Sequence, residues 1–313
     1  MTNKQQLEQY LLALGALSTS MMQEIARKVA EKEQEIEDEE DIKTLVALMF
    51  ASAPGLRRRF QKQVNDFLKE WNISEIINKC ADDIGHPINS NSKTVETIEN
   101  GLKAMPAGAT RRMNEMVNEI SNRTGLKKEA VETALEHFAG KNIPAIQYED
   151  GKTVSVESYA KTAINTDLHT AQLEKEAEER EKNGIHLVYA APRREACPKC
   201  IPWLGVIMYD DFYSTGPVPD DNAYPLLSEA VKNGFLHPNC RDTIRTVTPA
   251  VQDSIRPMTE REQKEAEERY KKEQYINYLK RNIKRYKILE SAYPEKYTQM
   301  RKRWEERLKE AES

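Results

Sequence analysis

The stretches "CPKCIPWLG" at residues 197–205 and "FLHPNCRD" at residues 235–242 decide how the middle of this chain folds. Together they hold four side chains of the kinds that bind zinc: Cys197, Cys200, His237 and Cys240. Within each stretch two residues separate the two ligands, a spacing that places both on one tight turn. We call residues 197–200 the CxxC turn and residues 237–240 the HPNC turn. Because residues 201–236 exceed the insert of a small zinc finger, the spacing predicts one structural zinc site whose halves enclose a folded insert.

Three other interpretations of these residues stay open. They can pack as an ordinary core without a metal. The strand-like run before Cys197 also suits a thioredoxin-like dithiol, but a proline and a glycine follow too soon for the helix that such a motif opens. A cysteine hydrolase would use Cys240 as nucleophile and His237 as base, with Asp242 as the nearest carboxylate. The remaining cysteine, Cys80, has helical apolar spacing, which predicts a buried small side chain.

The composition favours long polar helices. Charged residues make up 31% of the 313-residue chain, hydrophobic residues make up 39%, and the mean hydropathy is −0.75. Such values predict helices that are solvated or covered by partners rather than one large core. No run approaches the roughly 18 apolar residues that cross a bilayer, and the apolar run at residues 10–17 is too short for a signal peptide. We therefore expect a protein assembled in the cytoplasm, without a membrane partner.

Residues 3–140 have apolar positions at intervals of three and four residues, which predicts a series of helices. Glycine and proline residues indicate where these helices end. The predicted ends lie near Pro54 and Gly55, near Pro106 and Gly108, at Gly125 and at Gly140.

Between residues 143 and 250 the pattern becomes mixed. It predicts a hairpin at Asp150–Gly151, a helix over 158–182, a strand over 186–191, a hairpin or strand pair turning near Gly205, a short helix closed by Gly234 and a strand within 241–249. The expected fold class is α+β: mainly helical, with a small module of short antiparallel strands held by the CxxC and HPNC turns. We predict three regions: a helical N-terminal region (1–142), the mixed module (143–250) and a charged helical tail (251–313).

The C-terminal tail is basic and rich in aromatic residues. Residues 269–309 carry fourteen Lys and Arg against five Asp and Glu, a local charge of +9 in a chain of net charge −4. The aromatic and apolar residues of the tail recur at helical spacing. This spacing favours an amphipathic helix that docks on a protein surface over a helix that binds nucleic acid. In the second case the contacting side chains would be Lys271, Lys272, Lys280, Arg281, Lys284, Arg285, Arg301, Lys302 and Arg303.

Residues 145–248 resemble the minor capsid, or head morphogenesis, proteins of tailed phages that infect Gram-positive bacteria. The residues that carry the resemblance are Cys197, Cys200, Trp203, Gly205, Tyr224, Pro225, Leu226, His237, Pro238, Asn239, Cys240 and Arg241. Many relatives have a further cysteine or histidine after the arginine, where this chain has Asp242 and Thr243. If the family's metal site uses that extra ligand, this chain must complete the set with the CxxC and HPNC turns alone.

The resemblance implies a low-copy structural component of the phage head, located inside the head or at the portal vertex. It implies a role in head assembly and in DNA ejection, with portal protein, capsid or scaffold subunits and packaged DNA as partners, and it implies no enzymatic activity. Two alternatives stay open: a DNA-binding internal head protein that uses the basic tail, and a thiol-dependent enzyme.

Overall fold

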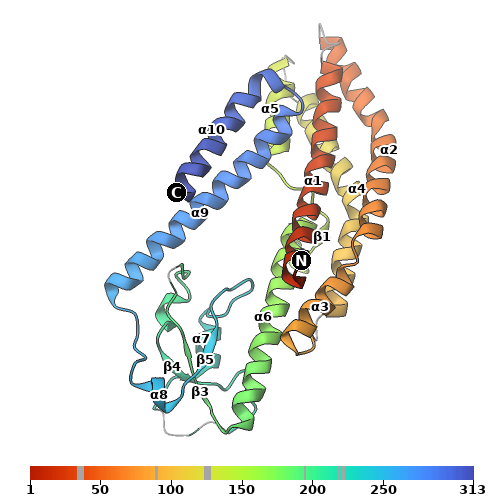
Figure 1. The fold of residues 1–313 in the computed structure, drawn as a ribbon. Coiled ribbons are helices and arrows are strands. Elements are labelled where there is room, and N and C mark those ends of the chain that lie inside the picture. Colours follow the sequence, from red (N-terminus) through yellow and green to blue (C-terminus); the bar gives the residue numbers. More distant parts are fainter. Residues whose placement is uncertain (34–38, 89–90, 123–127, 194, 218, 220–222) are drawn as a thin grey trace. The chain divides into compact units, whose positions relative to one another are not determined.

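The computed structural model describes residues 1–33, 39–88, 91–122, 128–193, 195–217, 219 and 223–313 (Figure 1). The chain is mainly helical and contains two small antiparallel sheets, which confirms the predicted α+β class. It forms two compact units. Unit 1 consists of Met1–Ser74, Ser92–Ala160 and Ile276–Ser313, and unit 2 of Glu75–Asn91 and Lys161–Tyr275. The division into three regions at residues 142 and 250 stays a prediction.

The helices before the first hairpin are α1 (Asn3–Glu33), α2 (Glu39–Glu70), α3 (Ile73–Ile84), α4 (Asn91–Asn122) and α5 (Lys128–Ala139). The mixed region contains β1 (Ile146–Gln147), β2 (Thr153–Val154), α6 (Val156–Lys182), β3 (Leu187–Ala190), the 3-10 helix η1 (Ile201–Trp203), β4 (Ile207–Tyr209), α7 (Leu227–Lys232), β5 (Ile244–Thr246) and α8 (Pro249–Gln252). The tail contains α9 (Glu260–Glu290) and α10 (Pro294–Glu312).

Helix α1 shows why the N-terminal part of the chain is helical. Its buried residues recur every three or four positions, so they form one apolar stripe along the helix. Near the start of this stripe the ring of Tyr10 lies 5.6 Å from Phe67 and 5.9 Å from Trp71. Full burial of one large apolar side chain stabilises a fold by about 2 kcal/mol, so the stripe anchors α1 on the end of α2.

Helices α2 and α4 run through Pro54 and Pro106, so the helix ends predicted at these prolines are wrong. A proline frees the carbonyl four residues earlier, which at Pro54 belongs to Phe50, a residue that is 39% exposed and open to water. Near Pro106 tertiary packing holds the helix. A Cβ at Gly108 would lie only 2.3 Å from the carbonyl oxygen of Pro144, so the chain packs directly on the α4 backbone.

Most of the other helix ends and turns predicted in the first 182 residues are confirmed. Helix α5 ends at Ala139, which confirms the end predicted at Gly140, while Gly125 lies outside the described residues. The hairpin at Asp150–Gly151 is confirmed, because β1 pairs antiparallel with β2 and Gly151 has a φ of +82°. The helix predicted over 158–182 is also confirmed, as α6.

In unit 2 the antiparallel sheet has the order β4-β3-β5. Val188 in the central strand lies opposite Met208 on one side and Thr246 on the other. The strands predicted over 186–191 and within 241–249 and the helix before Gly234 are thus confirmed. The hairpin predicted at Gly205 is not: η1 precedes this glycine, and the strand after it pairs with β3 instead.

A buried ion pair joins α6 to the end of β4. The Arg180 guanidinium donates to the Asp210 carboxylate, and both side chains are almost fully buried. The second carboxylate oxygen of Asp210 accepts the backbone N–H of Tyr213 at 3.0 Å. Removing one member of such a pair leaves an uncompensated buried charge, which costs about 3 to 5 kcal/mol. The pair therefore attaches α6 to β4, an edge strand of the sheet.

Gly205 is required by both its backbone conformation and its surroundings. Its φ is +75°, and a Cβ there would lie 1.9 Å from the carbonyl oxygen of Arg256. We predict that Gly205→Ala lowers the free energy of unfolding by about 3 kcal/mol, measured by urea denaturation. Gly184→Ala is the matched control, because φ is +65° there and a Cβ would have no neighbouring atom within 4 Å; strain alone costs about 1 kcal/mol. Equal losses in the two variants would contradict the role of the close contact.

Candidate metal centre

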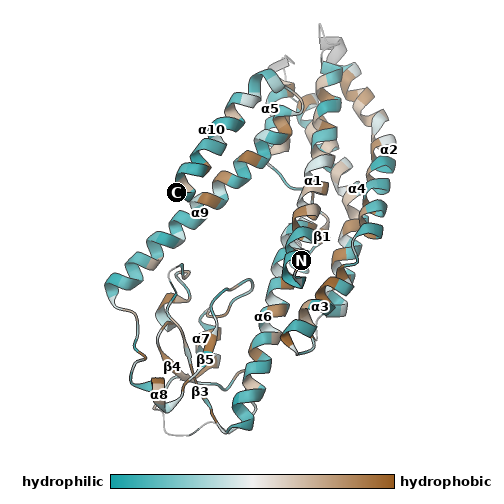
Figure 2. Cartoon of the chain, in the orientation of Figure 1, coloured by the Kyte–Doolittle hydropathy of each residue, from teal (hydrophilic) through white to brown (hydrophobic). Residues whose placement is uncertain are grey.

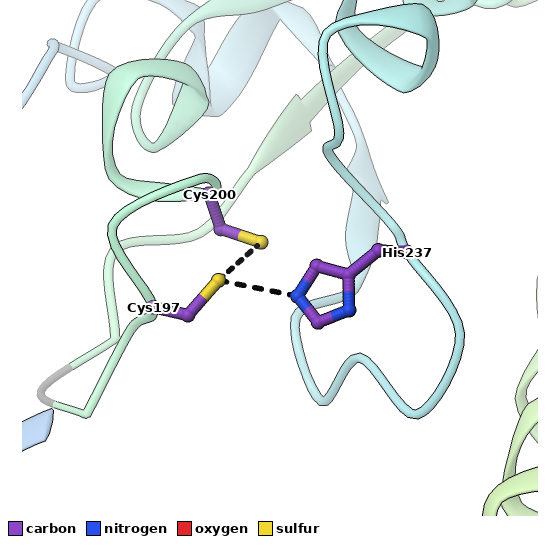
Figure 3. A group of neighbouring side chains, drawn as sticks. All are labelled: Cys197, Cys200 and His237. Carbon is purple, nitrogen blue, oxygen red and sulfur yellow. Dashed lines mark hydrogen bonds between the residues drawn. The ribbon is translucent and has the colours of Figure 1, made fainter.

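The structure brings the CxxC and HPNC turns together (Figure 3). The Cys197 Sγ atom lies 3.4 Å from Cys200 Sγ and 3.2 Å from His237 Nε2. The Cys200 Sγ atom lies 3.6 Å from Cys240 Sγ. Three thiols and one imidazole from two distant stretches of sequence therefore form one cluster within unit 2.

The CxxC turn is a tight turn directly before η1. The backbone N–H groups of Cys200 and Ile201 donate to the carbonyl oxygen of Cys197 at 2.9 and 3.1 Å. This closes the turn and directs both thiols to the same side, as Figure 3 shows. The sheet supplies the support, because the core residues around β3 and β4 also enclose the fully buried Cys200.

The HPNC turn has the residues that its backbone requires. The N–H of Cys240 donates to the carbonyl oxygen of His237 at 2.8 Å, with Pro238 and Asn239 at the two central positions. Asn239 has a φ of +61°, and proline followed by asparagine is the pair that a type II turn favours. The sequence thus closes a turn that projects His237 and Cys240 toward the CxxC turn.

Helix α6 holds the HPNC turn in place. The Thr166 hydroxyl accepts the backbone N–H of Asn239 at 2.9 Å, and the Asn165 amide donates to the Asn239 side chain at 3.3 Å. Sequence reasoning missed both residues, because a polar side chain within an amphipathic helix looks like ordinary solvated surface. Only the tertiary structure shows that they position the ligands.

The hydrogen bonds of His237 select its tautomer. Its Nδ1 atom lies 3.0 Å from the carbonyl oxygen of Pro238, which can only accept, so Nδ1 carries a proton. In the neutral ring the Nε2 atom that faces Cys197 then has a free lone pair. Orientation of a histidine by a backbone carbonyl is the usual arrangement around a metal ligand.

Hydrogen bonds inside the cluster shift the pKa values of its cysteines. Burial would raise the pKa of Cys197, but hydrogen bonds with His237 and Cys200 outweigh burial and lower the pKa. A hydrogen bond with Cys200 also lowers the pKa of Cys240, against the effect of burial. The same hydrogen bond, together with burial, raises the pKa of Cys200. The cluster thus favours thiolates at Cys197 and Cys240, and the thiolate is the form that binds metals.

The donor set fits a soft or borderline divalent metal. With a Zn–S bond of about 2.3 Å, two thiolates on a tetrahedral zinc lie about 3.8 Å apart, close to the 3.4 and 3.6 Å between the sulfur pairs here. Two groups of three ligands share Cys200, and within each group all ligand atoms lie within 4.8 Å of one another. These groups are Cys197, Cys200 and His237, and Cys200, Cys240 and Asp242.

Asp242 is a member of the cluster that sequence reasoning considered only as a hydrolase carboxylate. Its side chain is almost fully buried, with one oxygen 3.6 Å from Cys240 Sγ and the other 3.1 Å from Arg193 Nε. Its backbone N–H lies 3.4 Å from the same sulfur. Burial lowers the pKa of His169 on α6, and the negative charge of Asp242 opposes this shift. The Asp242 carboxylate therefore lies beside the cysteine thiols and is paired with the Arg193 guanidinium.

The geometry does not resemble either catalytic alternative. The imidazole of His237 faces Cys197 rather than Cys240, the thiol that the hydrolase hypothesis requires. The element after the CxxC turn is the three-residue η1, so no helix N-terminus activates a dithiol. All four cysteines are free thiols, and Cys80 is buried away from this cluster on α3, as predicted.

The predicted nucleic-acid-binding residues fall into two groups. Four of them form ion pairs with glutamates: Lys280, Lys284, Arg285 and Arg301. The other five form no side-chain hydrogen bond or ion pair with any residue that the structure describes: Lys271, Lys272, Arg281, Lys302 and Arg303. Two of these ion pairs, Lys284 with Glu157 and Arg285 with Glu136, join the tail to acidic residues that lie far earlier in the sequence.

The tail docks on the helices of its own unit. The Tyr297 hydroxyl donates to Glu136 on α5 at 2.7 Å, and Lys284 pairs with Glu157 at 2.7 Å. The Gln23 amide on α1 donates to the carbonyl oxygen of Lys287 at 3.2 Å. The amphipathic surface predicted to dock on a protein therefore has, in unit 1, a partner within the chain.

The fold and the cluster define a mainly helical α+β protein with a cysteine and histidine centre that can hold a metal. Among the described residues, no helix is both long and apolar enough to cross a membrane. Residues 3–313 match the family model of phage minor capsid protein 2, and the chain belongs to this family. It is thus a structural protein of the phage head, and the resemblance seen over 145–248 extends over essentially the whole chain. No curated protein and no solved structure matches it.

We predict that Thr166→Val loosens the HPNC turn. The valine removes the acceptor of the Asn239 N–H, which should lower the free energy of unfolding by about 1 to 2 kcal/mol. Thr166→Ser is the matched control, since it keeps the hydroxyl. Chemical denaturation of the three proteins compares them, and a serine variant as unstable as the valine variant would show that the methyl group, not the hydrogen bond, matters.

Proposed function

We propose that this chain is a structural head protein that assembles at the portal of a tailed phage, with unit 2 locked by one zinc ion. The ligands would be Cys197, Cys200, His237 and Cys240. The observation that carries the zinc proposal is the convergence of the CxxC and HPNC turns: Cys197, Cys200 and His237 form one group of neighbouring ligand atoms, and Cys240 contacts this group through Cys200.

The chemistry of the ligands supports zinc over harder cations. Three thiolates and an imidazole are typical of structural zinc sites, whereas magnesium and calcium prefer oxygen ligands. A bound zinc ion would draw Cys240 from Asp242 toward Cys197 and His237. Asp242 would then lie beside the ligands, and its backbone N–H would support the Cys240 thiolate.

The role in head assembly rests on family membership. A minor capsid protein must bind other head components, and the long polar helices offer surface for such contacts. Nothing in the described site requires catalysis, so we propose a non-enzymatic role. Portal binding, the low copy number and a part in DNA ejection are predictions from the family resemblance.

The zinc proposal predicts close to one zinc ion per chain in purified protein, measured by elemental analysis. Cys197→Ser and Cys240→Ser should each lose the metal and melt at a lower temperature, because structural zinc contributes directly to folding. Cys80→Ser is the matched control, as it removes a buried thiol outside the cluster. Wild-type protein free of metal, with a melting temperature that chelator leaves unchanged, would exclude the zinc site.

The assembly proposal predicts that the chain copurifies with portal protein when both are produced together. Cys240→Ser should reduce this association only if unit 2 contributes to it. Association of the chain with isolated capsid subunits but not with portal would contradict the portal location, while leaving its place in the head intact.

A further inference from the structure

Two cavities in unit 1 lie against the same stretch of α9. The first, of about 500 Å³, lies between α1 and α9 and is lined by Thr19 and Gln23 on α1. The second, of about 380 Å³, is lined by Tyr278 and Asn282 on α9. Lys284 lines both cavities, so they adjoin along this helix.

The lining of the two cavities is strongly basic. Its cationic residues are Lys141, Lys280, Arg281, Lys284, Arg285 and Lys287. Among the described residues, the only acidic side chain in either lining is Glu157. The lysines on α9 follow one another at intervals of four and three residues, so a positive charge recurs about every 5 to 6 Å along the helix. Such a row matches a ligand with repeated negative charges.

Half of these cations form no hydrogen bond or ion pair within the part of the chain that the structure describes, although Lys287 interacts electrostatically with Glu290. Three form ion pairs: Lys280 with Glu312, Lys284 with Glu157 and Arg285 with Glu136. The side chains of Lys141, Arg281 and Lys287 are exposed and form no hydrogen bond or ion pair with any other described residue. The three ion pairs hold α9 against neighbouring helices. The three cations without an ion pair can therefore contact an anionic ligand.

We propose that these cavities bind the phosphate groups of a nucleic-acid strand. Arg281, Lys287 and Lys141 would contact phosphates of the strand, and the ion-paired Lys280 and Lys284 would add positive potential along α9. The neutral wall of α1 offers a hydroxyl and an amide and no competing carboxylate. The shared chemistry is the phosphoryl group, which a DNA backbone or a free nucleotide can supply.

An aromatic side chain favours nucleic acid over an acidic peptide. Tyr278 lines the second cavity, is 45% exposed, and stands one turn from Arg281 and Asn282 on α9. The Tyr278 ring packs edge-on against Trp304, with 5.8 Å between the ring centroids, and its exposed part offers a base a surface to stack on beside the cations. Such stacking holds single strands with little sequence preference. A peptide rich in carboxylate side chains has no aromatic ring to stack on this surface. This proposal is independent of the zinc site and of portal binding.

The test is binding of a fluorescent single-stranded oligonucleotide to the full chain, followed by anisotropy at several salt concentrations. The triple variant Lys141→Gln, Arg281→Gln, Lys287→Gln should bind about tenfold more weakly, with a salt slope shallower by about 2. None of the three substitutions breaks an internal ion pair among the described residues. The matched control Lys271→Gln, Lys272→Gln, Lys302→Gln removes three exposed lysines outside the cavities and should bind nearly as the wild type does. Equal losses in the two triple variants would overturn the proposal.

Competitors separate the sources of the negative charge. Tripolyphosphate should compete only weakly, and ATP somewhat better, if a strand is the ligand. Polyglutamate of matched length should not compete at the same charge concentration. Tyr278→Leu should weaken binding of the strand about fivefold or more and leave tripolyphosphate binding unchanged. Equal binding of polyglutamate and the oligonucleotide, or strand binding unaffected by Tyr278→Leu, would overturn the assignment to nucleic acid.

Discussion

The contact between the CxxC turn and the HPNC turn is the constraint that links distant parts of unit 2. The three strands of this unit have only three or four residues each, so their ladders supply few hydrogen bonds. The two turns lie at opposite ends of the insert that contains β4 and α7, and their side chains meet within 3.2 to 3.6 Å. A contact between the ends of this insert closes it into a loop and so reduces the conformational freedom that the insert would otherwise keep. The buried pair of Arg180 with Asp210 then attaches the module to α6.

The sequence predicted best where local chemistry decides the structure. The hairpin at Gly151, the helix closed by Gly234 and the positions of the two turns all follow from residues whose backbone preferences are strong and act over a few positions. Gly205 was correctly singled out but misinterpreted. It has a positive φ, and the carbonyl of Arg256 lies against it; no pattern within residues 203–212 contains that contact.

Prediction failed where distant residues decide. Proline was expected to end α4, but packing of the distant Pro144 on α4 outweighed the local preference. The pattern of apolar residues in the basic tail predicted that the tail docks on a protein surface, but it did not show which surface. The glutamate partners of the tail on α5 and at the start of α6 lie more than a hundred residues earlier. In Figure 2 the first turns of α9 are almost uniformly hydrophilic, as expected from a helix whose sequence is so polar.

Asp242 shows how a departure from a family pattern can be accommodated. The family resemblance implies a further cysteine or histidine after the arginine of the HPNC turn, whereas this chain has a carboxylate in that part of the cluster. A buried carboxylate is costly unless it is paired, and here Arg193 pairs with one oxygen while Cys240 contacts the other. Its backbone N–H, which any residue other than proline would supply, already supports the Cys240 sulfur. The Asp242 side chain therefore serves as an ion-pair partner of Arg193, and the proposed zinc site needs only the four side chains of the two turns. An aspartate can occupy this position because Arg193 is close enough to neutralise it.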